Sequence, residues 1–293
     1  MKIALYDEWR VGLVDTAEGV IADVTSAVPG HTADPFGAGW WVRMCRELET
    51  LRAGLTGVAR DSTVPLRDAR LRPAALNPSK IIACASNYSA HVGEMMAVQE
   101  RVAGGMEAWM AEFDVFLKAP SSVIGPGEAV LLPAAPLSEG REIHHECELA
   151  LVIGKAGAHI PADRAVEHIL GYTICLDITV RGPGDRSRRK SYDTFTPTGP
   201  WVVTRDEIAD PHDLEITLEV DGEVRQRVST SGMTVRIPEI VAQASACMTL
   251  LPGDLILTGA PPGVGQIFAG ERLKASISGI GSMELTVAAA AGD

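Results

Sequence analysis

The chain has 293 residues, enough for one large domain or for a small domain followed by a larger one, and its apolar content of 46% is that of a globular protein. A formal net charge of −12 disfavours general binding to nucleic acid or to an anionic membrane. An anionic substrate would need a local attraction, from a metal ion or a few placed basic residues. Charges interrupt the N-terminus early and no apolar stretch approaches about 18 residues, so the sequence predicts neither a secretory leader nor a membrane span.

The first segment predicts three short strands, at 2–6, 11–14 and 20–24, and then a helix over 40–55. The stretch "RLRPAALNPSK" contains two prolines and few periodic apolar positions, which indicates a boundary near residue 72. We therefore expect residues 1–72 to form a small β-rich cap or dimerisation domain. Residues 73–293 would form the catalytic domain.

The second segment opens with a buried strand over 80–85 and continues with a helical composition over 91–112. The pair Gly104–Gly105 interrupts that helix, so it is either a mobile lid or a kinked, partly buried helix. From residue 115 onward short β-type segments dominate, with two short helices expected at 162–169 and 237–250. Many strands and few helices predict a mostly-β (α+β) mixed roll or sandwich, and argue against a βαβ sheet.

Two glutamates precede an apolar run in "HHECELALVIG", residues 144–154. Side chains two apart on a strand share a face, so Glu146 and Glu148 project side by side. Asp177 closes another apolar strand, and three carboxylates at strand ends could bind Mg²⁺, Mn²⁺ or Ca²⁺. They could also be solvated charges. His144 shares the face of the glutamates and His145 precedes them, so zinc or iron stays open.

His91 and Glu94 in "NYSAHVGE" are three apart and would be neighbours on one helical face. A carboxylate beside an imidazole can produce a general base for water. The alternative is an ordinary surface pair at the start of a helix.

Basic residues gather in "RGPGDRSRRK" and at the end of "VFLK". In an acidic protein such a local cluster suits a carboxylate-bearing substrate. The alternative is a solvated loop, which we expect for Arg188 and Arg189. The basic residues concerned are Lys118, Arg181, Arg186, Arg188, Arg189 and Lys190.

The turn "LTGAPPGVG" (257–265) can offer backbone N–H groups and the Thr258 hydroxyl to an anion, although it lacks the pattern of a phosphate loop. A plain tight turn is the alternative. The five cysteines are scattered and odd in number, which predicts buried free thiols in a reducing cytoplasm.

The order of these segments resembles that of the fumarylacetoacetate hydrolase family over about residues 78–288. The small N-terminal segment is similar to the variable cap of that family, and the loop "RGPGDRSRRK" resembles that of bacterial members from aromatic catabolism. The segments that carry the resemblance are "NYSAHVGE", "FLKAPSSVIGPGEAVLLP", "HHECELALVIGK", "GYTICLDITVRG", "KSYDTFTPTGPWVVT", "GDLILTGAPPGVG" and "SGIGSMELTV".

The resemblance implies a mixed β-roll catalytic domain, a homodimer, and a role for each matching residue. It implies a site for Mg²⁺ or Mn²⁺, with Ca²⁺ as a further option, a pair that activates water, a lysine that stabilises developing charge, and several substrate contacts. In that order, the residues are the metal ligands Glu146, Glu148 and Asp177, the pair His91 and Glu94, the lysine Lys190, and the substrate contacts Lys118, Arg181, Thr258 and Gly259.

The implied reaction is hydrolysis of a C–C bond in a 2,4-dioxo acid such as fumarylpyruvate or fumarylacetoacetate. It would give pyruvate or an acetoacetate-type product plus a carboxylic acid. The alternatives are a 2-oxo-acid decarboxylase or keto–enol isomerase on the same metal site and, remotely, a non-catalytic binding protein. Ala260 stands where the family turn more often has a second Thr, which leaves the acyl group of the substrate open.

Overall fold

The computed structural model describes residues 1–37, 39–58, 62–105 and 107–290. Met106 of the predicted broken helix and the last three residues of the predicted catalytic domain therefore lie outside the described residues. Within those ranges, the strands form one sheet of eleven strands, one of five and one of three. The fold is α+β with large mixed sheets, as the sequence predicts. No helix among the described residues combines the length and the apolar character needed to cross a membrane.

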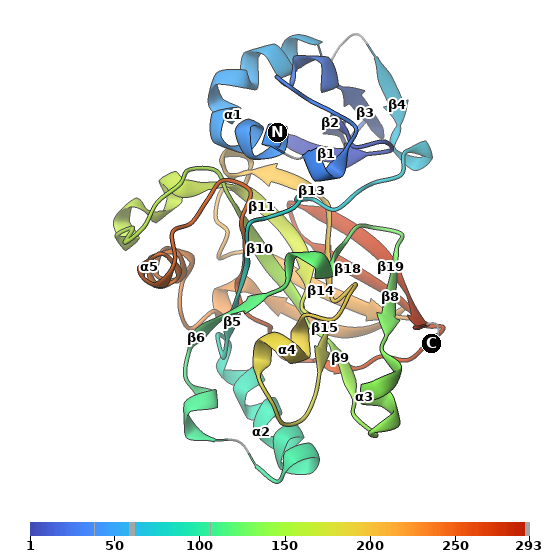
Figure 1. Cartoon of the computed structure of the whole chain (residues 1–293), viewed down its shortest axis with the longest axis vertical. Helices are drawn as coiled ribbons and strands as arrows, with labels where there is room; N and C mark the ends of the chain where they lie inside the picture. Colours follow the sequence, from blue (N-terminus) through green and yellow to red (C-terminus); the bar gives the residue numbers. More distant parts are fainter. Residues whose placement is uncertain (38, 59–61, 106, 291–293) are drawn as a thin grey trace.

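The large sheet has the order β4-β3-β2-β1-β13-β11-β10-β16-β5-β6, with β7 paired to β13. The N-terminal strands β1 to β4 continue this sheet because β1 pairs with β13. Figure 1 shows these strands and α1 gathered at one end of the molecule. The strands of this sheet are β1 (Lys2–Tyr6), β2 (Arg10–Asp15), β3 (Val20–Asp23), β4 (Thr63–Pro65), β5 (Ile81–Ala85), β6 (Asp114–Lys118), β7 (Val123–Ile124), β10 (Cys147–Ile153), β11 (Ile169–Leu176), β13 (Thr196–Thr204) and β16 (Leu255–Leu257).

The two smaller sheets complete the roll. The five-stranded sheet has the order β15-β14-β18-β19-β8, and the three-stranded sheet has the order β12-β9-β17. Their strands are β8 (Ala129–Leu132), β9 (Ile143–His145), β12 (Thr179–Val180), β14 (Glu215–Val220), β15 (Glu223–Ser229), β17 (Gly265–Gln266), β18 (Arg272–Ile277) and β19 (Gly281–Ala289).

The central strands β10 and β11 are buried along their whole length, which explains their continuous apolar sequences. One face of the large sheet packs against the apolar face of α1, which contributes Trp40, Trp41 and Met44. The opposite face joins the five-stranded sheet in the larger core. The site described below lies where β10 and β11 meet their flanking loops.

The α-helices are short apart from α1 and α2. Gly104 ends α2 in a left-handed conformation (φ 73°). Its N–H donates to the carbonyl of Glu100, and the N–H of Gly105 donates to the carbonyl of Gln99. The predicted break at the glycine pair is therefore confirmed, and a 3₁₀ turn follows at Ala108–Ala111. The α-helices are α1 (Gly39–Val58), α2 (Ser89–Ala103), α3 (Ala134–Ser138), α4 (Arg186–Lys190) and α5 (Ile237–Cys247).

Four expectations differ in detail from the structure. The segment expected as a helix over 162–169 is a 3₁₀ helix over Ala162–His168, while the helix expected over 237–250 ends at Cys247. The loop "RGPGDRSRRK" contains a helical turn, α4, which begins after Asp185; the carboxylate of Asp185 accepts from the N–H of Arg188. All five cysteines are free, but Cys247 is exposed, so the prediction of a buried thiol is wrong there.

Candidate active site

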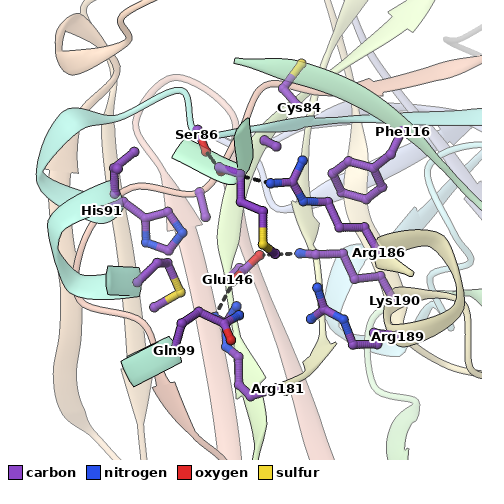
Figure 2. Close-up of a pocket in the computed structure, with 15 residues that line it drawn as sticks. Cys84, Ser86, His91, Gln99, Phe116, Glu146, Arg181, Arg186, Arg189 and Lys190 are labelled. Carbon is purple, nitrogen blue, oxygen red and sulfur yellow. Dashed lines mark hydrogen bonds and ion pairs between the residues drawn. The ribbon is translucent and has the colours of Figure 1, made fainter. Parts of the chain in front are cut away.

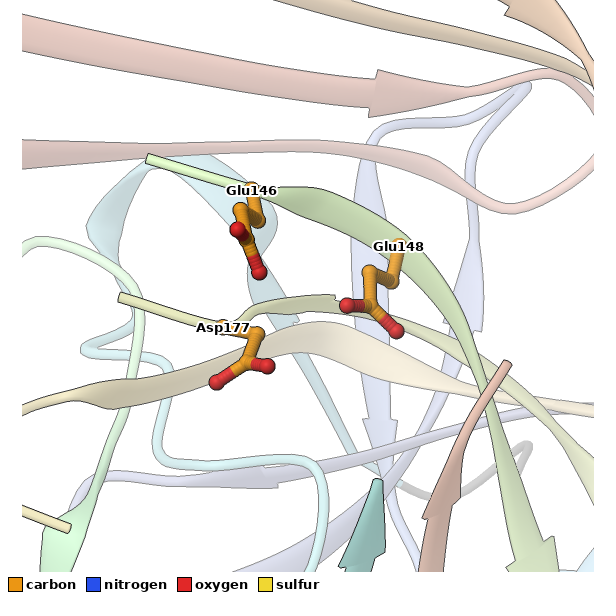
Figure 3. Close-up of side chains that lie close together, drawn as sticks. All are labelled: Glu146, Glu148 and Asp177. Atoms are coloured by element: carbon orange, nitrogen blue, oxygen red, sulfur yellow. The ribbon is translucent and has the colours of Figure 1, made fainter. Parts of the chain in front are cut away.

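Three carboxylates meet at one end of the central strand pair. β10 and β11 are antiparallel, with Cys147 opposite Leu176, so the residue before β10 and the residue after β11 are neighbours. The N–H of Asp177 accordingly donates to the carbonyl of Glu146 at 2.8 Å. One oxygen from each of Glu146, Glu148 and Asp177 lies within 4.8 Å of the other two, and Figure 3 shows the three carboxylates facing one another.

Cations already contact two of the three carboxylates. Glu146 accepts from Arg181 at 2.5 Å and from Lys190 Nζ at 2.7 Å. Asp177 accepts from Lys118 Nζ and from Lys190 Nζ, both at 2.5 Å. Burial would raise the pKa of Glu146, but Lys190 and Arg181 outweigh it and hold the pKa well below its usual range. Glu146 is therefore a carboxylate at neutral pH.

Glu148 lacks such a cation. Its Oε2 accepts from the N–H of Gly259 at 2.6 Å, while its buried Oε1 has no hydrogen-bond partner among the described residues. Burial, followed by the charges of Asp177 and Glu146, raises its pKa well above the usual range. A buried oxygen without a partner is costly, and the three side chains supply only the oxygen ligands that Mg²⁺ and Mn²⁺ prefer. The residues present therefore fit a hard divalent cation.

A cavity of about 70 Å³ adjoins the carboxylates. Figure 2 shows His91 and Gln99 on one side of it, and Arg186, Lys190 and Arg189 from α4 on the other, with Glu146 between them. A second cavity of about 540 Å³ shares four lining residues with the first: Gln99, Met110, Phe116 and Arg186.

The predicted pair His91 and Glu94 lies on the first turns of α2. His91 is buried, and its Nδ1 is 3.6 Å from Glu94 Oε2. The Glu94 carboxylate also accepts from the N–H of Gly263 at 2.9 Å. Burial alone would raise the pKa of Glu94. The contacts with His91 and with the backbone outweigh burial and hold the pKa below its ordinary value. A charged Glu94 is placed to orient the His91 ring.

The turn over 257–265 is held by two buried side-chain amides whose role the sequence does not predict. Asn87 Nδ2 donates to the carbonyl of Thr258 at 2.7 Å. Gln226 Nε2 donates to the carbonyl of Pro261 at 3.1 Å, and its Oε1 accepts from the N–H of Cys147 at 3.0 Å. Gln226 is completely buried although it lies in "EVRQRVS", a strand of mostly exposed charges. The only feature of the sequence that indicates the burial of Gln226 is that this neutral residue stands between two arginines.

The two histidines next to the glutamates have other partners. His144 Nε2 lies 2.8 Å from Glu142, and His145 Nδ1 lies 3.3 Å from Gln226 Oε1. Burial lowers the pKa of each to about 4, so both are neutral at pH 7. Neither joins the carboxylate cluster found among the described residues, which leaves an all-oxygen ligand set.

The basic loop is less solvated than expected. Arg188 is exposed, but Arg189 is 5% exposed, so the expectation of a solvated side chain is wrong for Arg189. The short helix α4 turns Arg189 inward, where its guanidinium donates to the carbonyls of Val180 and Gly184.

Three predicted substrate contacts, Lys118, Thr258 and Gly259, are absent from the lining of the cavity. Lys118 is buried between Asp177 and the carbonyl of Phe195, and the Thr258 hydroxyl donates to the carbonyl of Leu149 at 2.9 Å. Neither residue lines the cavity, whereas Ala260 does. The N–H of Gly259 already donates to Glu148, and substrate contact by Lys118, Thr258 and Gly259 stays a prediction.

Residues 80–288 match the family model described as "Fumarylacetoacetate (FAA) hydrolase C-terminal". The chain belongs to the fumarylacetoacetate hydrolase family. The matched residues include every residue of the cluster, the pair and the turn described above, and the family resemblance predicted from the sequence is confirmed.

Full-length relatives of this family member include enzymes of two kinds. A maleylpyruvate hydrolase of Aquipseudomonas alcaligenes is 39% identical over 291 residues, covering 98% of this chain and 99% of that protein. The crystal structure of a maleylpyruvate hydrolase from Sphingobium sp. SYK-6, in complex with manganese(II) and pyruvate, has a TM-score of 0.85 at 35% identity and covers 99% of this chain and 100% of that one. A 5-carboxymethyl-2-hydroxymuconate delta-isomerase from Mycobacterium smegmatis has a TM-score of 0.74 at 34% identity over the whole of both chains.

Proposed function

We propose that the protein is a metal-dependent hydrolase that cleaves a C–C bond in acylpyruvates, which are 2,4-dioxo acids. This proposal rests on one observation: three features of the site meet at the same cavity. The first is the buried carboxylate cluster with its unpartnered Glu148 oxygen, which reaches the cavity through Glu146. The second is the pair His91 and Glu94, which reaches it through His91. The third is a cationic wall opposite His91. The similarity to maleylpyruvate hydrolases over the full length supports it.

Glu146, Glu148 and Asp177 would hold the divalent cation. When bound, it supplies Lewis acidity, which polarises an oxo group and stabilises negative charge on oxygen. Lys190 contributes a fixed positive charge beside it, because its Nζ contacts both Glu146 and Asp177 at one edge of the cavity. Arg181 lines the same edge.

His91 is placed to act as the general base. Glu94 lies next to Nδ1 and favours the tautomer with a proton there, so that Nε2 is the basic nitrogen. Nε2 takes a proton from water as the water oxygen attacks the C4 carbonyl of the substrate. The C3–C4 bond then breaks, its electron pair passes to C3 of the pyruvate fragment, and protonation of C3 completes the balance. The products are pyruvate and a carboxylic acid.

A second candidate is keto–enol isomerisation of a 2-oxo acid on the same site, and 2-oxo-acid decarboxylation is its close relative. The full-length structural similarity to an isomerase favours this candidate. Neither reaction needs an attacking water. Hydrolysis therefore requires His91 as the base that activates water, whereas isomerisation and decarboxylation do not.

The deciding experiment is turnover of fumarylpyruvate and oxaloacetate with MnCl₂, with MgCl₂ and with EDTA, followed by identification of the products. We expect pyruvate plus fumarate from fumarylpyruvate, and complete loss of the reaction in EDTA. Release of carbon dioxide, or enol interconversion without cleavage, would replace the hydrolase by the second candidate. The choice between magnesium and manganese, the homodimer and the cytoplasmic location stay predictions.

A further inference from the structure

The cations that line the small cavity fall into two pairs. Arg181 and Lys190 contact carboxylates of the cluster. Arg186 and Arg189 have no carboxylate within ion-pair distance among the described residues, although both side chains line the cavity. Arg189 is buried and Arg186 is partly exposed, and neither is in direct contact with a carboxylate, so this second pair leaves positive charge that an anion entering the cavity can neutralise.

Arg186 lies where the two cavities meet, since it lines both. Its Nη2 donates to the carbonyl of Met110 at 2.9 Å, and its guanidinium lies 5.3 Å from the centre of the Trp109 ring. Burial lowers its pKa from the ordinary value of an arginine, and the carboxylates of Asp114 and Glu146 oppose that shift. A guanidinium has five N–H donors, so the bond to Met110 leaves donors for a ligand.

Arg189 is more buried than Arg186 and lies on the same side of the small cavity (Figure 2). Its guanidinium donates to two backbone carbonyls, those of Val180 and Gly184. Burial and the neighbouring Arg181 lower its pKa to about 10, which still leaves the side chain charged at pH 7. Its charge therefore adds to that of Arg186 at this side of the cavity.

We propose that Arg186, assisted by the charge of Arg189, binds a second carboxylate at the far end of the acyl group. The preferred substrates are then acylpyruvates whose acyl group ends in a carboxylate, and Arg186 is the residue that selects them. This inference rests on the proposed function, in which the carboxylate cluster and Lys190 take the pyruvate end. The cavity continues past Arg186 into the larger one, which gives a longer acyl chain room on that side.

The test compares fumarylpyruvate with acetylpyruvate, whose acyl group carries no carboxylate. The ratio of kcat/KM for the two substrates is measured with MnCl₂ in the wild type, Arg186→Gln, Arg186→Lys and Arg188→Gln. Arg188 is the matched control because it lies on the same helical turn but is exposed. We expect the wild type to favour fumarylpyruvate, and Arg186→Gln to lower the ratio on the order of 100-fold, since a charge-assisted pair to a buried carboxylate is lost.

Arg186→Lys should keep part of the preference, and Arg188→Gln should keep all of it. A general loss of folding or of metal binding would lower both rates together and leave the ratio unchanged. An unchanged ratio in Arg186→Gln, or a wild type that prefers acetylpyruvate, would overturn the assignment.

A binding measurement separates this inference from the proposed function. Calorimetry gives the Kd of both compounds for Mn²⁺-loaded His91→Ala and for His91→Ala combined with Arg186→Gln. We expect the preference in Kd for fumarylpyruvate to fall when Arg186 is replaced. A wild type that binds fumarylpyruvate but does not hydrolyse it would refute the proposed hydrolase activity. The role of Arg186 would then be decided by comparing the ratio of the two Kd values with and without Arg186→Gln. Equal ratios in the two variants would refute that role whatever reaction the wild type performs.

Discussion

Glu148 and Glu94 are held by the same turn, although one belongs to the carboxylate cluster and the other to the predicted base. The N–H of Gly259 donates to Glu148 at 2.6 Å, and the N–H of Gly263, four residues later, donates to Glu94 at 2.9 Å. The turn over 257–265 therefore fixes the distance between the metal side and the base side of the site. Displacing it should affect both sides at once.

The first prediction concerns Glu148→Gln. Without metal, the change removes one of three adjacent buried carboxylates, so the variant in EDTA should melt at or above the temperature of the wild type. Added MnCl₂ should raise the Tm of the wild type but not that of the variant, because only the wild type gains binding free energy. Activity should be lost. Thermal melts with EDTA and with MnCl₂ check this, and a Mn²⁺-induced rise in the variant equal to that of the wild type would contradict the ligand role.

The second prediction concerns His91→Ala. Loss of a general base lowers the rate about 10²- to 10⁴-fold, while the carboxylate cluster is untouched. The Mn²⁺-induced rise in Tm should therefore persist. Glu94→Gln should lower kcat less, because the amide still occupies the space of the carboxylate but orients the imidazole less strongly. Steady-state rates with fumarylpyruvate decide the matter, and wild-type hydrolysis by His91→Ala would exclude the proposed base.

The third prediction concerns Gly259→Ala, with Gly270→Ala as its control. Both glycines have φ 99°, but a Cβ at position 259 would lie 2.7 Å from Asn87 Cβ, whereas one at position 270 has nothing within 4 Å. Backbone strain costs each variant about 1–3 kcal/mol, and overpacking adds roughly 1–3 kcal/mol at position 259 alone. Urea unfolding measures the difference. Equal losses in the two variants would show that the turn yields to the added methyl group.

The fourth prediction concerns Gln226→Leu. This change leaves the N–H of Cys147 and the carbonyl of Pro261 without the amide that now joins them. Each buried polar group left unpaired costs about 1–3 kcal/mol, so the variant should lose several kcal/mol and bind Mn²⁺ more weakly. Gln226→Glu keeps the acceptor for Cys147 and should lose less. A Gln226→Leu variant as stable as the wild type in urea would mean that water replaces the amide.

The fifth prediction concerns the ion pair between Arg101 on α2 and Glu142. Arg101 holds the pKa of Glu142 at about 2, against the effect of burial. A depressed carboxyl pKa adds stability that is present above the unfolded value near about 4.3 and is lost as pH falls toward 2, so the pair is intact from pH 5 to 9. Arg101→Gln or high salt should speed amide exchange in α2 by about two- to fivefold. Arg164→Gln removes an exposed arginine paired elsewhere, with Glu167, and should leave exchange in α2 unchanged.

The residues of the carboxylate cluster were predictable because period-two spacing and strand ends are visible in sequence. Glu146 and Glu148 flank one residue, and Asp177 ends an apolar run. Their convergence depends on the antiparallel register of β10 and β11, which spacing alone does not give. The family resemblance supplied that relation before the structure did.

Gln226 and Arg189 could not be predicted by the same reasoning. Each lies in a run of charged residues, and such runs predict a solvated face. Their burial is decided by tertiary contacts: β15 brings Gln226 under the turn, and α4 rotates Arg189 toward the backbone of β12. The pattern of polar and apolar residues indicates the average surroundings of a segment. It therefore does not predict the burial of a single inward-facing residue in a polar segment.

The small volume of the cavity has a consequence for the timing of the reaction. About 70 Å³ is far below the roughly 300–1,000 Å³ of typical ligand pockets, and Met95, Gln99 and Met110 form part of its wall. A seven-carbon acid therefore either extends into the adjoining cavity of about 540 Å³ or requires the wall formed by α2 and the turn at Ala108–Ala111 to move aside. In the second case each catalytic cycle would include one opening for entry and one for exit. The rate of that opening would then set an upper bound on kcat that no improvement of the carboxylate cluster could raise.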